Sequence, residues 1–96
     1  MRSPKPHTRE QARRALARTL IALRRRADGV SQETLANSAA VDRSYMPEIE
    51  RGLSSPTVDI LCRLLPVLGV SFEQFGAEFD KQLRSAAKTP KPTSSC

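Results

Sequence analysis

Residues 31–52, SQETLANSAAVDRSYMPEIERG, decide the fold of this chain. Apolar residues recur there at helical spacing in two short stretches, which only Ala40, Val41 and Asp42 separate. Two helices joined so closely have no room for a long antiparallel hairpin, so they must cross at a steep angle. The segment therefore predicts helices at 32–39 and 43–51, the second of which protrudes. Two core helices of an unrelated bundle are the alternative.

The predicted helix starts share one formula: an apolar residue, a capping side chain, and an apolar residue five positions after the first. It occurs at Val30-Ser31-Leu35, Val41-Asp42-Met46 and Val70-Ser71-Phe75. Each is an N-cap with a hydrophobic staple. An apolar stripe from Thr8 or Arg9 to Ala27 adds a first helix, and no stretch alternates with period two. The chain is therefore predicted to be all-α, with five helices at about 9–27, 32–39, 43–51, 58–68 and 72–84.

The 96 residues have room for one domain. Residues 1–8 hold two prolines and no apolar pattern, so we expect a flexible basic arm before the helical domain, 9–84. Residues 85–96 offer nothing to bury and are expected to form a disordered tail. No run approaches the ~18 apolar residues of a membrane span. The first residues also lack the apolar core of a secretory signal, so a cytoplasmic location is expected.

The formal charge of +6 is unevenly distributed. Residues 1–26 hold nine Lys or Arg and one acid, whereas residues 27–96 hold seven bases and nine acids. A basic N-terminal region on a small domain favours a polyanionic partner such as nucleic acid. A basic face that is simply solvated is the alternative.

The sequence contains few of the residue patterns that enzymes use for catalysis. Its one histidine, His7, lies in the arm, and there is no cysteine–histidine pair, metal-ligand cluster or phosphate-binding loop. We therefore expect no catalytic activity, no metal and no cofactor. Cys62 and Cys96 are too few for a disulfide framework. Cys62 lies in an apolar run and is expected to be a buried structural thiol.

The string VSQETLANSAAVDRSYMPEIERGLSSPTVDILCRLLPVLGVSFEQF, residues 30–75, resembles the phage-repressor/Cro (xenobiotic-response-element) type of helix-turn-helix transcriptional regulator. The matching features are SQ-x-x-LA at 31–36, DRSY-x-x-x-IERG at 42–52, the Pro-Thr before the fourth helix, and LGVS at 68–71. This family includes repressors, controllers of restriction–modification systems, and antitoxins. The resemblance implies sequence-specific binding of double-stranded DNA, with helix 43–51 in the major groove, by a repressor or controller.

The base-reading positions that the resemblance implies are Arg43, Ser44, Pro47 and Glu48, which share one side of the second helix. Arg43 can grip guanine O6 and N7, and Glu48 can accept from a cytosine amine or orient Arg43. Pro47 departs from the family pattern. Proline inside a helix removes a hydrogen bond and crowds the carbonyl four residues earlier, here that of Arg43. The helix is expected either to bend near its N-terminus or to have an irregular first turn.

The phosphate-binding residues expected are Ser31, Gln32, Tyr45, Arg51, Arg24 and Arg25. Ser31 caps a helix whose first turn, at Gln32, has free N–H groups that can hold a phosphate. The alternatives assign these residues no contact with DNA. Gln32 is then an exposed polar residue, Tyr45 packs beside the turn, and the charge of Arg51 only stabilises the C-terminal end of its helix.

The resemblance also implies a structural pair between Glu50 and an arginine near the end of the first helix. Arg24 is favoured for this pair. One residue is inserted before Gly29 relative to the family, so Arg25 remains an alternative.

Phe79 and Leu83 extend the apolar stripe of the last helix beyond the family match. Because a domain this small is not expected to bury them, we expect a homodimer through this helix. It would present two recognition helices to half-sites of a palindromic operator about 34–36 Å apart. One alternative is a helix that folds back over its own core. Another is an antitoxin-like or other protein-interaction module that binds a partner through this helix or the tail.

Overall fold

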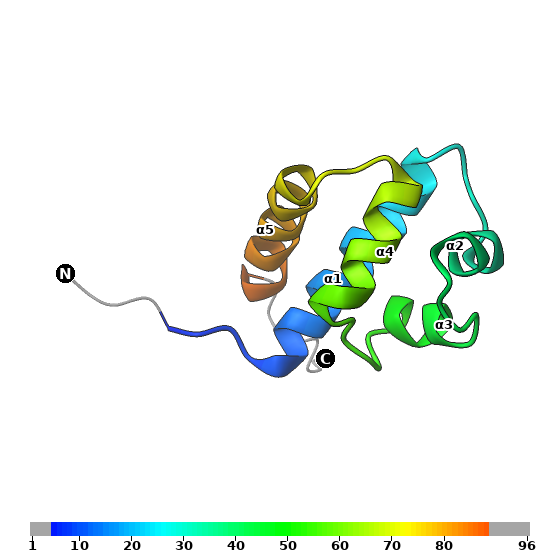
Figure 1. The fold of residues 1–96 in the computed structure, drawn as a ribbon. Coiled ribbons are helices and arrows are strands. Elements are labelled where there is room, and N and C mark those ends of the chain that lie inside the picture. The colour runs from blue at the N-terminus through cyan, green and yellow to red at the C-terminus, as the bar shows by residue number, and fades with distance from the viewer. Residues whose placement is uncertain (1–4, 89–96) are drawn as a thin grey trace.

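The computed structural model describes residues 5–88, which form five α-helices: α1 (Arg9–Arg26), α2 (Gln32–Ala39), α3 (Tyr45–Glu50), α4 (Val58–Leu68) and α5 (Phe72–Lys88). No strand occurs among these residues, so the predicted all-α fold with five helices is confirmed. In Figure 1, α2 and α3 lie on one side of the molecule and α5 on the opposite side. No single helix described here is long and apolar enough to cross a membrane. Only α4 and α5 together would be, and they meet at a bend of 106°.

Two helices differ from their predicted bounds by more than one residue. α3 begins at Tyr45 instead of residue 43 and ends at Glu50. α5 continues to Lys88, so residues 85–88, which the sequence assigned to the tail, are helical. The buried side chain of Ala86 gives these residues an apolar contact that the sequence did not reveal. The rest of the expected tail, 89–96, and residues 1–4 of the expected arm lie outside the described residues.

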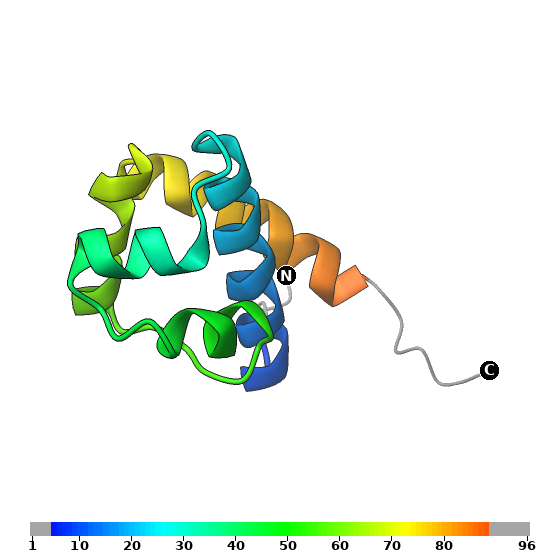
Figure 2. The same cartoon turned by 90° about the vertical axis from the view of Figure 1, so that its right-hand side faces the viewer.

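One apolar core holds the helices together. α3 and α5 pack against α1, and α2 packs against α3 and α4. Figure 2 shows α2 and α3 on the face turned toward the viewer. The largest side chains with almost no exposure come from four of the helices: Leu20, Leu35, Met46, Ile49, Leu64 and Leu65. Complete burial of such a side chain contributes roughly 1.5–3 kcal/mol, so this cluster is a substantial part of the driving force for folding.

Cys62 is exposed, so the expectation of a buried thiol is wrong. α4 buries the stripe formed by Leu61, Leu64, Leu65 and Leu68, and the helical period turns Cys62 away from that stripe. Pro66, four residues later, is exposed as well. The carbonyl of Cys62, which loses its helical donor at Pro66, therefore lies on the side that water can reach.

α5 packs along α1, and one ion pair joins the two helices. Arg26 Nη2 lies 3.1 Å from Glu78 Oε1, and Gln82 Nε2 donates to Glu78 Oε2 at 2.7 Å. The hydrogen bond from Gln82, together with the charge of Arg26, holds the pKa of the buried Glu78 carboxyl below its usual value. Within α5, Phe79 stacks on Phe75 with ring centroids 5.6 Å apart, and both rings contact the core. α5 thus folds back over the core of its own chain.

The turn between α2 and α3 contains a left-handed alanine. Ala40 has φ 57° and ψ 45°, and the N–H of Val41 donates to the carbonyl of Ala36 at 2.9 Å. α4 ends in the same way at Gly69 (φ 72°), where the N–H of Val70 donates to the carbonyl of Leu65 at 3.0 Å. Because left-handed geometry costs an L-residue roughly 1–2 kcal/mol, Ala40 is strained where Gly69 is not.

We predict that Ala40→Gly stabilises the protein by about 0.5–1 kcal/mol, because relief of this strain exceeds the entropy that glycine adds to the unfolded chain. Urea denaturation measures the free energy of unfolding. The matched control is Gly69→Ala, which should destabilise through the backbone alone, since a Cβ there meets no atom within 4 Å. A loss of stability in Ala40→Gly would contradict the strain argument.

Candidate nucleic-acid interface

A buried ion pair joins α1 to α3. Arg24 donates from Nε to Glu50 Oε2 at 2.7 Å and from Nη2 to Glu50 Oε1 at 2.9 Å. Arg24 Nη1 donates to the carbonyl of Val30 at 2.9 Å, and Gln32 Nε2 donates to Glu50 Oε1 at 2.9 Å. The side chains of Glu50 and Arg24 are only 5% and 18% exposed. The structure thus brings together three predicted site residues, which we call the Arg24–Glu50–Gln32 network.

The inserted residue before Gly29 does not displace Arg24. α1 ends at Arg26, and both Asp28 and Gly29 take left-handed geometry, with φ 60° and 66°. The insertion is therefore contained in this turn. The side chain of Arg25 is exposed and has no hydrogen bond or ion pair among residues 5–88, so Arg24 is the arginine that meets Glu50. The hydrogen bond to Glu50 raises the pKa of Arg24 further above its already high value, so the arginine stays charged.

The start of α2 lies beside this network. Ser31 is its N-cap, and Ser31 Oγ accepts a hydrogen bond from the N–H of Thr34 at 3.0 Å. The N–H groups of Gln32 and Glu33, in the first helical turn, have no acceptor within the helix. Since the Gln32 amide is held by Glu50, its position relative to these N–H groups is fixed. The result is a set of donors able to bind an anion.

The conflict at Pro47 disappears because α3 starts later than predicted. Pro47 is the third residue of α3, and a proline in the first turn removes no helical hydrogen bond. Before the helix, Asp42 Oδ1 accepts from the N–H of Ser44 at 3.0 Å and from its Oγ at 2.9 Å. Arg43 and Ser44 therefore belong to a turn closed by Asp42. Of the two outcomes expected, the irregular first turn is found, in the form of a shorter helix.

The α2–α3 face exposes Arg43, Ser44 and Glu48, with Pro47 half-buried beside them. Two of these polar side chains have partners that the sequence did not identify. Arg43 Nη1 lies 2.7 Å from Glu33 Oε2, and Ser54 Oγ donates to Glu48 Oε1 at 3.2 Å. In the sequence, the contact between Arg43 and Glu33 is indicated only by an acid, Glu33, in the first turn of the helix before Arg43. The opposite side of α3 buries Met46 and Ile49 completely.

Tyr45 packs against the core, and its hydroxyl reaches the surface. The side chain is half-buried, and Tyr45 Oη donates to the carbonyl of Ser55 at 3.2 Å. This contact joins the start of α3 to the loop that follows it. Tyr45 therefore has a packing role in the structure, and its hydroxyl lies against the loop between α3 and α4.

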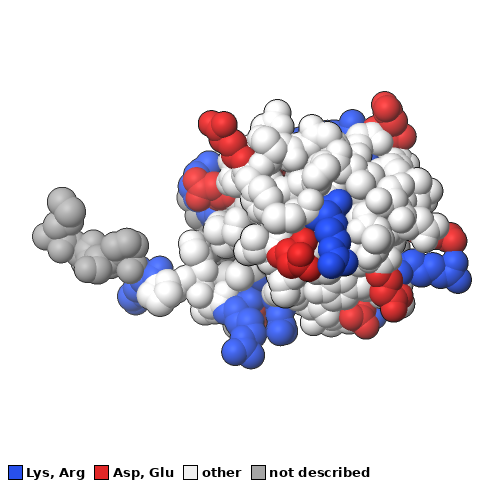
Figure 3. Space-filling view, viewed as in Figure 1, with Lys and Arg blue, Asp and Glu red and all other residues white. Residues whose placement is uncertain are grey.

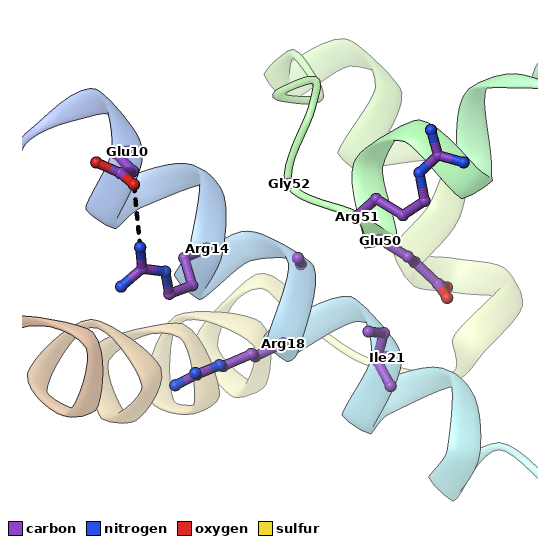
Figure 4. A pocket seen from close by; sticks show the side chains of 8 residues that line it. Glu10, Arg14, Arg18, Ile21, Glu50, Arg51 and Gly52 are labelled. Carbon is purple, nitrogen blue, oxygen red and sulfur yellow. Dashed lines mark hydrogen bonds and ion pairs between the residues drawn. The ribbon is translucent and has the colours of Figure 1, made fainter. Parts of the chain in front are cut away.

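A groove of about 320 Å³ separates α1 from the end of α3 (Figure 4). Its basic side chains are Arg14, Arg18 and Arg51. Arg14 is paired with Glu10 at 3.1 Å, whereas Arg18 and Arg51 are exposed and form no ion pair within the described chain. Figure 3 shows further Lys and Arg side chains gathered where α1 begins. Unneutralised positive charge thus borders the Arg24–Glu50–Gln32 network, in which the charges cancel.

The residues expected at a dimer interface are partly covered by their own chain. Phe79 is half-buried through its contact with Phe75 and the core, and Leu83 is half-buried further along α5. Phe72, at the start of α5, is 46% exposed. Residues 5–88 contain no group of three or more His, Cys, Asp or Glu side chains placed to hold a metal ion.

Residues 15–78 match the model of a helix-turn-helix domain family. Among solved structures, the clp gene regulator ClgR from Corynebacterium glutamicum is similar, with 27% identity, a TM-score of 0.73 and coverage of 88% of this chain and 84% of that one. An HTH_3 family transcriptional regulator from Vibrio cholerae is 33% identical with a TM-score of 0.68, over 85% of this chain and 45% of that one. The comparison with curated proteins gave no match. The resemblance inferred from the sequence is thereby confirmed.

We predict that Glu50→Ala lowers the free energy of unfolding by about 2–3 kcal/mol, because it leaves a mostly buried guanidinium without its carboxylate. Fully buried pairs lose roughly 3–5 kcal/mol, and the residual solvation of Arg24 places this loss lower. The matched control is Asp80→Ala, which removes a carboxylate from an exposed pair with Arg84 and should change stability little. Equal losses in the two variants, measured by urea denaturation, would contradict a structural role for the network.

Proposed function

This chain belongs to the helix-turn-helix domain family, and on that premise we propose that it is a sequence-specific regulator of transcription that reads double-stranded DNA. In this proposal the first turn of α2 meets the phosphate backbone and the exposed side of α3 enters the major groove. The observation that carries the proposal is the Arg24–Glu50–Gln32 network. It fixes the start of α2 and the end of α3 together, so both present their free groups on one face.

The phosphate contacts in this proposal come from neutral donors and from unpaired cations. Ser31, Gln32 and the free N–H groups of the first turn of α2 supply hydrogen bonds. Arg51, exposed and unpaired within residues 5–88, supplies charge at the end of α3. Arg25, exposed and without an ion pair among the same residues, adds charge at the other margin. Arg24, whose charge Glu50 neutralises, contributes the N–H groups that Glu50 and Val30 leave free. Tyr45 adds its hydroxyl beside the loop after α3.

The base contacts are assigned to the exposed residues around the start of α3. Arg43 donates to guanine O6 and N7, Glu48 accepts from a cytosine amine, and Ser44 serves either a base or a phosphate. The ring of Pro47 is apolar and suits a thymine methyl group. The turn closed by Asp42 fixes the backbone of this segment, so these side chains start from defined positions.

The charge of α1 supports the same partner. Nine of the chain's 16 Lys and Arg residues lie in residues 1–26, with one acid among them. Arg18, on α1 at the edge of the groove between α1 and α3, forms no ion pair among the described residues. A long-range attraction of this kind raises the rate of association with a polyanion and gives binding a strong salt dependence.

We further propose that the protein acts as a repressor or controller, as a two-fold dimer through α5, without catalysis. Two copies related by a two-fold axis match a palindromic operator with half-sites about 34–36 Å apart. The exposure of Phe72 and the half-exposed Leu83 support an apolar contact along α5. The competing proposal is a protein-interaction module, antitoxin-like, that uses the same surface for another protein.

We predict different losses from two substitutions at the interface. Arg43→Ala should reduce discrimination at one base pair by about 1–3 kcal/mol, because a bidentate contact to guanine is lost. Gln32→Ala should weaken binding to all duplexes alike, because it loses a phosphate contact that carries no sequence information. A selection from a random duplex pool, followed by titration of the selected and a scrambled duplex, measures both effects.

Arg51→Ala provides the electrostatic reference, since loss of one phosphate contact should flatten the slope of log affinity against log salt by about 0.9. Arg84→Ala, on the exposed face of α5, should leave affinity and slope almost unchanged. Equal affinity of the native protein for selected and scrambled duplexes would overturn the assignment of a sequence-specific regulator.

The dimer is best tested at Leu83, because Phe79 also packs against the core. We predict that light scattering gives the native protein twice the mass of its 10.6 kDa chain, and that Leu83→Glu halves this mass. The same variant should retain the native helical circular dichroism and lose affinity for a duplex with two half-sites. A native protein that stays monomeric while it saturates such a duplex would contradict the dimer.

A further inference from the structure

We infer that Glu33 is a specificity-determining residue, which acts by positioning the guanidinium of Arg43 for base reading. This inference rests on the proposed function, because it concerns how the reading site discriminates between bases. The observation is the contact of 2.7 Å between Glu33 Oε2 and Arg43 Nη1, which links the first turn of α2 to the turn that precedes α3.

The contact has little to do with the stability of the fold. Both side chains are mostly exposed, 61% for Glu33 and 69% for Arg43, and ion pairs in water contribute little to the free energy of folding. The effect of the contact is to orient the side chain of Arg43. The backbone before α3 is already fixed by Asp42, which binds the N–H and hydroxyl of Ser44. The long side chain of Arg43 is the part left free to rotate, and Glu33 restrains it.

The restraint leaves Arg43 able to read a base. A guanidinium has five N–H donors, of which the contact with Glu33 uses one on Nη1. The remaining donors still offer a pair of parallel N–H groups, which guanine O6 and N7 require. A guanidinium held in one orientation loses less side-chain entropy when it forms such a pair, because less motion remains to be frozen.

Glu33 also discourages the wrong base. Its carboxylate lies one residue after Gln32, in the turn where a phosphate is expected, and an acid there repels DNA unless it is neutralised. When the duplex covers the site and water is expelled, the attraction between Glu33 and Arg43 becomes stronger. A base that draws Arg43 away therefore leaves the negative charge of Glu33 without its partner, close to the phosphates of the DNA. The pair thus improves discrimination more than affinity.

The first test compares the base preference of the native protein with that of Glu33→Ala, Glu33→Gln and Arg43→Ala, each selected from the same random duplex pool. Arg43→Ala identifies the base pair that Arg43 reads. At that pair, Glu33→Ala should lose at least about threefold of the native preference, and Glu33→Gln should keep more of it. Glutamine retains an oxygen that can accept from Arg43 Nη1.

Asp80→Ala is the matched control, because Asp80 and Arg84 form an ion pair of similar exposure, 69% and 64%, on α5. It removes the same charge without touching the α2–α3 face, so the base preference should stay native. Thermal unfolding of each variant shows whether the fold is retained. A uniform rise in affinity for all duplexes, in both Glu33→Ala and Asp80→Ala, would reduce Glu33 to a general surface charge and overturn the inference.

The second test asks whether Glu33 is repulsive once its partner is gone. The double variant Arg43→Ala with Glu33→Ala should bind a scrambled duplex about threefold or more tightly than Arg43→Ala alone, near the lower end of coupling energies between contacting residues. Additive effects of the two substitutions would overturn the inference.

These outcomes separate the two proposals. If Arg43→Ala changes the preference at one base pair and Glu33→Ala leaves it native, the inference about Glu33 fails while the proposed function stands. If the native protein selects no sequence, the proposed function and the inference that rests on it fail together.

Discussion

The ion pair of Arg24 with Glu50 is the constraint on which the arrangement of the first three helices depends. It joins residues 26 positions apart in the chain. The Glu50 carboxylate also accepts from Gln32, and the Arg24 guanidinium also donates to the carbonyl of Val30, so three helices and one turn meet at a single ion pair. Apolar packing alone tolerates small rotations of a helix, whereas two parallel hydrogen bonds between a guanidinium and a carboxylate do not. The pair therefore adds a directional restraint on α3 to the packing of Met46 and Ile49.

The charges of the molecule divide into two groups that serve different ends. At the centre of the α2–α3 face, Glu50 neutralises Arg24, and Glu33 lies against Arg43. At the margins, Arg18, Arg25 and Arg51 have no acidic partner among residues 5–88. Attraction to a polyanion thus comes from the margins, where salt screens it readily, while the centre supplies geometry. In the proposed function, selectivity therefore comes from the centre of the face and affinity from its margins.

Local sequence signals predicted the fold well, because capping residues and apolar spacing act over a few positions. Ser31 and Ser71 each cap the helix that follows them, as the sequence indicated. The choice between Arg24 and Arg25 stayed open in the sequence, since it depends on how the turn at Asp28 and Gly29 absorbs an extra residue.

The errors and omissions have a different physical origin. The start of α3 was placed too early because Asp42 was assigned as a helix cap, whereas its carboxylate closes a turn at Ser44 instead. Cys62 was placed inside because its neighbours are apolar, although the helical period turns it outward. Glu33 was missed because its contact crosses between two elements, and no local rule describes such a contact.

Pro47, which the sequence alone places inside a helix where it would be destabilising, affects the energetics of binding to DNA. Its ring fixes φ in the first turn of α3, and the Asp42 turn fixes the residues just before it. The conformational entropy of this segment is therefore lost when the chain folds and not when it meets a duplex. An element ordered in advance should change its backbone dynamics little on binding. The heat of binding would then come chiefly from contacts and water, with no term for helix formation.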